Sequence, residues 1–157
     1  ATYFFTGIGR FAFISCKGGG ADEDGSVALY WSLNNSLQAN ITGFKNPQGL
    51  GYDYGLSTWV ANSGGGSCAS LTLAVVGGSF AATILPNITA DVEVGDNPTD
   101  CVVEPFYTVL TLVPRSVIVT ARGSGEVVFI DALQPSRPSF SIDLPGGPQK
   151  VTCLIDQ

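Results

Sequence analysis

Three aromatic residues and one acid lie within eight positions of a glycine-flanked segment: Tyr52, Asp53, Tyr54 and Trp59. An aromatic ring offers an apolar face to a sugar, and a neighbouring carboxylate accepts hydrogen bonds from sugar hydroxyls. We therefore interpret these four residues as the candidate ligand-binding site, with a glycan as its ligand. The alternative interpretation is that the aromatic side chains fold back and cap the end of the domain.

Acidic residues also gather in the glycine-rich loop that ends at Gly25, where Asp22, Glu23 and Asp24 follow one another. Calcium binds to clustered carboxylate oxygens, so Asp22 and Asp24 are the candidate ligands if calcium binds at all. The bidentate glutamate of a helix–loop–helix calcium site is missing, because Leu33 holds its position. A solvated acidic loop is the alternative, and we predict no metal and no cofactor.

The sequence contains no histidine. This excludes the Ser–His–Asp and Cys–His nucleophile systems and removes the usual general base at neutral pH. A pair of carboxylates could still hydrolyse a glycosidic bond, but no motif marks such a pair among the thirteen acids. Phosphate-binding loops and dinucleotide fingerprints are absent as well. We therefore predict that the protein is not an enzyme.

The four cysteines, Cys16, Cys68, Cys101 and Cys153, form no C-x-x-C pair. Without histidine as a further ligand, this pattern favours disulfides over a zinc or iron–sulfur site. Cys16 and Cys68 are 52 residues apart, and so are Cys101 and Cys153. We predict these two sequential bridges, although four cysteines allow three pairings. The alternative is four buried thiols in a cytosolic protein.

Several features predict a secreted glycoprotein. The sequence starts at Ala1 without methionine, as a chain does after removal of a signal peptide. Disulfides persist only in oxidising compartments. Three sequons place candidate N-glycans on Asn34, Asn40 and Asn87, with unmodified polar loop residues as the alternative.

The charges and the hydropathy pattern exclude two kinds of partner. The net charge is −6, and the seven basic residues are scattered singly. We therefore predict no nucleic-acid partner, because nucleic acids require a basic surface that displaces counterions from phosphates. No apolar run of about 18 residues is present, so we predict no membrane span.

The sequence pattern predicts an all-β fold. Helical periodicity is absent, and 20 glycines and 9 prolines interrupt the chain about every ten positions. Residues 88–94 alternate between apolar and polar, as in a strand with one face in the core. Other segments are apolar on both faces, which favours sheet packed on sheet. We predict strands at 3–5, 11–16, 27–33, 36–42, 58–61, 68–76, 80–85, 88–94, 106–113, 116–121, 127–132, 139–144 and 151–155, some of which will merge or vanish.

The predicted architecture is a single domain over residues 1–157. We expect a two-sheet β-sandwich of about ten short strands, immunoglobulin-like or jelly-roll-like, that is cross-linked by disulfides. Gly123-Ser124-Gly125 between two β-branched runs predicts a hairpin. No internal repeat is evident beyond the equal spacing of the cysteines.

The order Cys16, Trp31, Cys68 resembles the cysteine–tryptophan–cysteine order of an immunoglobulin domain, in which the indole packs on the bridge. Such a domain has tyrosine two residues before its second cysteine, and here that position is Gly66. We keep the sandwich prediction and assign no family.

Residues 1–13 are rich in aromatic residues and carry one charge, Arg10. A strand of this kind can complete a neighbour's sheet, with Tyr3, Phe4, Phe5 and Ile8 as the assembly residues. The alternative is that it is the first strand of its own domain. We predict a non-enzymatic structural or adhesive subunit of an extracellular assembly that associates with copies of itself through strand addition. The alternative function is a secreted, lectin-like module that binds glycans.

Overall fold

The computed structural model describes residues 2–6, 9–19, 23–32, 34–53, 57–76, 83–107 and 112–153. The predicted all-β class is confirmed, because these residues form twelve strands and one short 3-10 turn, η1 (Ser63–Gly65). The strands are β1 (Thr2–Thr6), β2 (Gly9–Cys16), β3 (Asp24–Trp31), β4 (Ser36–Lys45), β5 (Pro47–Tyr52), β6 (Ser57–Asn62), β7 (Ser67–Val76), β8 (Thr83–Glu93), β9 (Pro98–Tyr107), β10 (Leu112–Ala121), β11 (Glu126–Asp131) and β12 (Pro138–Asp143).

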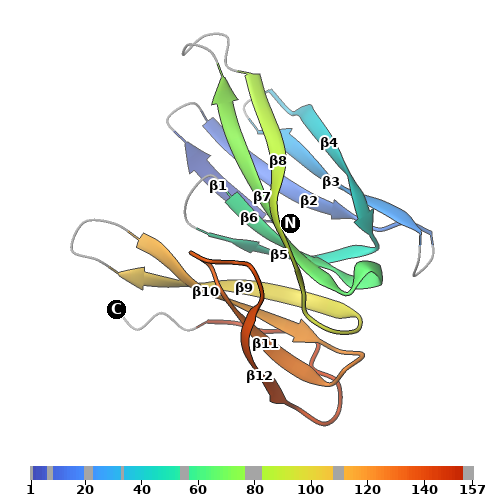
Figure 1. Cartoon of the computed structure of the whole chain (residues 1–157). Helices are drawn as coiled ribbons and strands as arrows, with labels where there is room; N and C mark the ends of the chain where they lie inside the picture. Colours follow the sequence, from blue (N-terminus) through green and yellow to red (C-terminus); the bar gives the residue numbers. More distant parts are fainter. Residues whose placement is uncertain are drawn as a thin grey trace.

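The strands form three antiparallel sheets of four strands each, where the sequence predicts two sheets (Figure 1). Sheet 1 contains β1–β4, sheet 2 contains β5–β8 and sheet 3 contains β9–β12, and strand neighbours in each sheet are consecutive in sequence. The Greek-key crossings of immunoglobulin and jelly-roll sandwiches are therefore absent from the described strands. A meander of four consecutive strands is instead the topology of a β-propeller blade.

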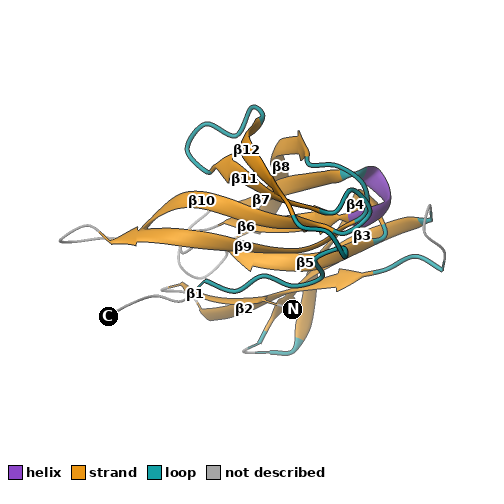
Figure 2. Ribbon diagram, turned by 90° about the horizontal axis from the view of Figure 1, so that it is seen from below, coloured by secondary structure: helices purple, strands orange, loops and turns teal. Residues whose placement is uncertain are grey.

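Sheet 2 lies between the other two sheets, because it shares a hydrophobic core with each. Figure 2 shows the strands of all three sheets in orange and η1 in purple. The core between sheets 1 and 2 is made of Phe11, Phe13, Val27, Leu29, Phe44, Val60, Ala69, Leu71 and Leu73. The core between sheets 2 and 3 is made of Trp59, Ala61, Cys68, Val92, Val94, Cys101, Val103, Val117, Val119, Ala121, Val128 and Ile130.

Strand β6 shows why the central segments are apolar without interruption. Successive side chains of a strand point to opposite faces. Val60 packs toward sheet 1, while Trp59 and Ala61 pack toward sheet 3. Both faces of β6 are buried, so the alternation of a half-exposed strand is lost.

The three sheets repeat one local design at their junctions. Pro47 begins β5, Pro98 begins β9, and Pro148 follows β12 at nearly the same interval. The residue before each proline has a left-handed backbone: φ is 47° at Asn46, 51° at Asn97 and 68° at Gly147.

A backbone hydrogen bond at the end of each sheet repeats as well. The amides of Asn46, Val94 and Leu144 follow the fourth strands of sheets 1, 2 and 3. They donate to the carbonyl oxygens of Glu23, Gly66 and Gly125, which lie in the turns between the second and third strands of the same sheets. The chain therefore contains three structural repeats, although the sequence analysis found none.

The first strands of neighbouring sheets approach each other closely. A Cβ atom on Gly49 of β5 would lie 2.9 Å from the backbone nitrogen of Cys101 in β9, and one on Gly51 would lie 3.1 Å from the carbonyl oxygen of Cys101. Glycine is required there because no side chain fits between the two backbones.

Residues 148–153 follow β12 and run beside β9. Thr99 Oγ1 donates to the carbonyl oxygen of Gln149 (3.0 Å), and the amide of Val151 donates to Asp100 Oδ2 (3.3 Å). The Gly147-Pro148 pair occupies the position after sheet 3 that Asn46-Pro47 and Asn97-Pro98 occupy after sheets 1 and 2.

The N-terminal strand pairs within its own chain. β1 is antiparallel to β2, with Tyr3 opposite Ala12, Phe4 opposite Phe11 and Phe5 opposite Arg10. Ile8 lies outside the described residues. The structure therefore places β1 at the edge of sheet 1, as in the intramolecular alternative of the sequence analysis.

Candidate functional site

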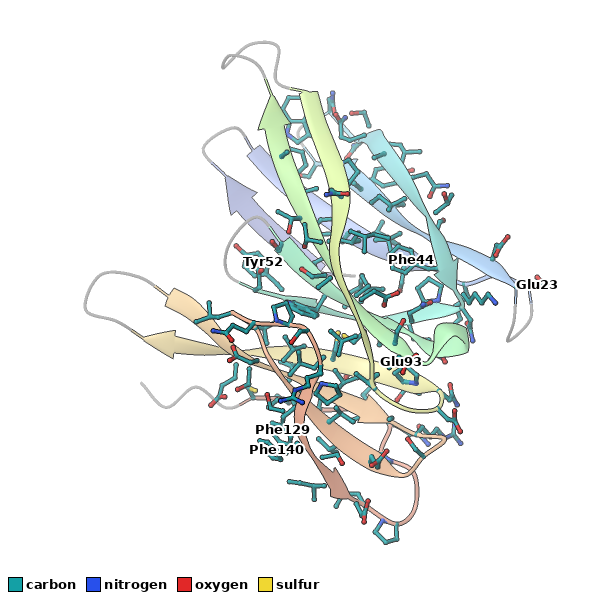
Figure 3. All side chains as sticks on the ribbon, in the orientation of Figure 1. Glu23, Phe44, Tyr52, Glu93, Phe129 and Phe140 are labelled. Atoms are coloured by element: carbon teal, nitrogen blue, oxygen red, sulfur yellow. The ribbon has the colours of Figure 1, made fainter. Side chains whose placement is uncertain are left out.

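The aromatic segment does not form one exposed platform. Trp59 is only 2% exposed and belongs to the core between sheets 2 and 3. Tyr52 is half-buried and packs against the core on the other side of sheet 2 (Figure 3). Asp53 Oδ1 accepts a hydrogen bond from the amide of Ser57 (3.2 Å), and Tyr54 lies outside the described residues. Trp59 and Tyr52 thus cannot stack on the same sugar.

The cysteines are not arranged as the sequence analysis predicts. All four lie in the described part of the chain and are free thiols, so neither the Cys16–Cys68 nor the Cys101–Cys153 bridge is formed. Cys16 is exposed at the end of β2 in sheet 1. Cys68 is buried in the core between sheets 2 and 3, where Cys101 is its hydrogen-bond partner. The structure therefore pairs Cys68 with Cys101 in space.

Burial raises the pKa of the Cys68 thiol well above its ordinary value, and the hydrogen bond with Cys101 acts in the same direction. The unfolded thiol ionises first as the pH rises, so the reduced protein is expected to keep its full stability below pH about 8.5 and to lose some above it. Urea unfolding at several pH values checks this expectation. The loss should shrink in Cys68→Ala, and an unchanged loss in that variant would contradict it.

The remaining sequence candidates lie at the surface. Asn34, Asn40 and Asn87 are all exposed, which leaves the three sequons accessible, and Asp24 is exposed at the start of β3. Asp22 lies outside the described residues. Within the described ranges, no group of three or more His, Cys, Asp or Glu side chains is placed to hold a metal ion. No helix among those residues has the length and apolar character needed to cross a bilayer.

The outer face of sheet 3, which points away from sheet 2, carries an apolar row across all four strands. Cross-strand pairing places Val102, Ile118, Phe129 and Phe140 side by side in that order. The rings of Phe129 and Phe140 stack with their centroids 4.2 Å apart (Figure 3). Phe140 is nevertheless 54% exposed, and its neighbour Ile142 is exposed as well. The sequence analysis predicts strands at 127–132 and 139–144 that are buried on both faces, whereas the structure leaves Phe140 and Ile142 exposed on the outer face.

The outer face of sheet 1 carries a similar row. Ala12, Tyr30 and Leu37 are paired in register across β2, β3 and β4, and Tyr3 of β1 is paired with Ala12. Ile14, Tyr30 and Leu37 are exposed. Each end of the stack of sheets therefore presents an apolar face that no described residue covers.

A polar groove of about 540 Å³ opens beside the end of β2 and the beginnings of β5 and β9. It is lined by Ser15, Lys17, Gln48, Gly49, Leu50, Thr99, Asp100, Gln149 and Lys150. Side chains with amine, amide, hydroxyl and carboxylate groups can together hydrogen-bond a polyhydroxylated ligand. The sequence analysis missed this groove because its residues come from β2, β5, β9 and the segment after β12.

Comparisons with known proteins identify the fold alone. No protein-family model matches the chain, and no curated protein matches it. A solved structure, Kuenenia stuttgartiensis Hydrazine Synthase, is similar over 79% of this chain with a TM-score of 0.61 and 16% sequence identity. The similar region covers 31% of that chain, so the likeness concerns part of a longer polypeptide.

Proposed function

We propose that the protein is a non-enzymatic structural subunit that assembles with copies of itself through the outer faces of its end sheets. The outer face of sheet 3 in one copy packs on the outer face of sheet 1 in the next copy. The observation that carries this proposal is the exposed apolar row on each end face, with Phe129 and Phe140 at one end and Tyr30 and Leu37 at the other. Exposed apolar patches of this kind mark association surfaces.

A second copy is the occupant because the missing contact repeats one that the chain already makes. Sheet 1 packs on sheet 2, and sheet 2 packs on sheet 3, each time through apolar faces of successive four-stranded meanders. Sheet 3 of one copy would pack on sheet 1 of another copy in the same way. The contact is head-to-tail, and a head-to-tail contact closes into a ring when its rotation allows.

The size of the faces fits a pair of copies. A face of four strands with six residues each measures about 19 by 20 Å. Two such junctions would bury on the order of 1,500 Å² in total, which is the size of a stable protein–protein interface. Two copies contribute six sheets, within the range of four to eight blades found in closed β-propellers.

Replacing Phe140 with aspartate is expected to separate the copies. Unglycosylated protein is used, because a sugar on Asn40, which is paired with Ala28 on the outer side of sheet 1, would oppose stacking. Phe140→Asp removes an exposed aromatic contact and places an unpaired carboxylate in the junction, so the dissociation constant should rise about 100-fold or more. Light scattering should give a dimer for the intact protein and a monomer for the variant.

Leu133→Asp is the matched control, because Leu133 is 66% exposed but lies in the loop between β11 and β12, outside the apolar row. It should remain a dimer. A second arm tests the head-to-tail geometry: Tyr30→Asp blocks the sheet 1 face, and mixing it with Phe140→Asp restores one of the two junctions. The mixture should associate more strongly than either variant alone and more weakly than the intact protein. An intact protein that stays monomeric at high concentration, or a mixture that associates no more strongly than either variant alone, would rule out the proposal.

The polar groove supports a second candidate function, the lectin-like module. Lys17, Gln48 and Lys150 supply exposed or half-exposed donors along its walls, in contrast to the buried Trp59. Under this alternative a glycan would bind in this groove.

A further inference from the structure

We propose that Cys68 and Cys101 form a disulfide that joins sheet 2 to sheet 3 through their shared core. The inference is independent of self-association, because both residues lie inside one chain and away from its outer faces.

The two thiols meet over β6. Cys68 of β7 is paired with Ala61 of β6, and both side chains belong to the core between sheets 2 and 3. Cys101 of β9 reaches into the same core, and its Sγ donates to the carbonyl oxygen of Trp59 (3.3 Å), two residues from Ala61. The side chains of Cys68 and Cys101 are themselves hydrogen-bonded. Both thiols are buried.

The backbones are held at this approach by Gly51. It is paired with Trp59 in sheet 2, and a Cβ atom on it would lie 3.1 Å from the carbonyl oxygen of Cys101. A disulfide needs Cα atoms within about 7 Å and side chains aimed at one another. The shared core and the hydrogen bond between the two side chains meet the second requirement.

The other two cysteines are poorly placed to compete. Alternation along β2 puts Cys16 on the outer side of sheet 1, because Phe11 and Phe13 point into the core between sheets 1 and 2. Sheets 1 and 2, which as stacked sheets are spaced about 10 Å apart, therefore lie between Cys16 and Cys68. Cys153 lies in the segment after β12 and is not a member of the core that holds Cys68 and Cys101. Burial raises the pKa of its thiol, and the nearby Glu104 carboxylate raises it further.

The bond forms by exchange with a small disulfide such as oxidised glutathione. One protein thiolate attacks the small disulfide, gives a mixed disulfide and releases one small thiol. The second protein thiolate then attacks the protein-bound sulfur and releases the other small thiol. The two cysteines lose two electrons and two protons in total, and the oxidant is reduced to two thiols.

Burial sets when this exchange takes place. A buried thiol with a raised pKa supplies little thiolate, and the packed core admits neither oxidant nor reductant. Oxidation must therefore precede the packing of sheet 3 on sheet 2. Once the core has closed, the same packing shields the disulfide from reductants.

The test refolds the full chain in a buffer of oxidised and reduced glutathione and compares it with protein kept under reductant. Thiol counting in denaturant should find two free thiols per oxidised chain, and peptide mapping should link 68 to 101. The melting temperature should exceed that of the reduced protein by about 5–15 °C, because the bond closes a loop in the unfolded chain and lowers the conformational entropy of the unfolded state.

Matched double variants locate the effect. Cys16→Ser with Cys153→Ser should keep the redox-dependent shift in melting temperature, and Cys68→Ala with Cys101→Ala should abolish it. The mapping of the unmutated chain remains decisive if the second variant folds poorly. Four free thiols after oxidative refolding, or bridges that include Cys16 or Cys153, would overturn the proposal.

Discussion

Trp59→Ala is expected to lower the free energy of unfolding by about 3–5 kcal/mol. The indole is 2% exposed and packs among the valines and cysteines that join sheets 2 and 3. Truncation leaves a cavity in a core bounded by two rigid sheets, which can collapse only in part. Chemical denaturation monitored by circular dichroism measures the loss.

Tyr30→Ala is the matched control, because Tyr30 is 38% exposed on the outer face of sheet 1. It should cost less than about 1 kcal/mol in the monomer. A Trp59→Ala protein with unchanged stability and selectively lost glycan binding would show instead that the indole belongs to a ligand site.

Gly49→Ala is expected to cost about 3 kcal/mol or more, a large effect for one added methyl group. The new Cβ would collide with the Cα of Asp100 and lie 2.9 Å from the nitrogen of Cys101. These are backbone atoms of β9, so relief requires that sheet 3 move away from sheet 2. The midpoint of urea unfolding gives the change.

Substitutions at two other glycines provide a graded comparison for this loss of stability. Gly51→Ala should cost less than Gly49→Ala, because its nearest neighbour would be 3.1 Å from the new Cβ. Gly43→Ala meets no atom within 4 Å and tests only the strain of its φ of 96°, about 1–2 kcal/mol. If the three substitutions cost the same, close backbone approach is not what fixes the junction between sheets 2 and 3.

The sequence predicted the fold class well, because alternation and turn residues are local signals. Gly123-Ser124-Gly125 joins β10 to β11 as predicted, with Ala121 opposite Glu126. Residues 58–61 and 68–76, interpreted as strands buried on both faces, lie in the central sheet. Burial on both faces reveals that a sheet has two neighbours, but it does not give the number of sheets in the stack.

The missed elements have a common physical cause. Pro47, Gly49 and Gly51 are turn formers by local preference, so the sequence predicts no strand between 42 and 58, where β5 lies. The tertiary structure uses the same glycines to bring β9 against β5. Pro98 likewise begins β9 at a position where the sequence predicts no strand.

The sequence predicted the candidate site less accurately than the fold class. Trp59 and Tyr52 are close in sequence, but strand alternation and pairing send them to opposite faces of sheet 2. The apolar rows on the end sheets depend on cross-strand register, which a single sequence does not contain. One available signal was overlooked: Asn-Pro at 46–47 and 97–98 and Gly-Pro at 147–148 recur at a nearly constant interval.

The repeated junction has a consequence for how the chain holds together. Among the described residues, the two hydrophobic cores join each sheet to the sheet before or after it in the chain. Such a molecule behaves as a one-dimensional array, whose stability is the sum of unit terms and nearest-neighbour coupling terms. The cooperativity of unfolding then depends on the two cores between neighbouring sheets. If one of these cores is weakened, the end sheet that it holds can unfold while the other two sheets stay folded. The same arithmetic lets an array of this kind gain or lose whole units of about fifty residues without redesign of those that remain.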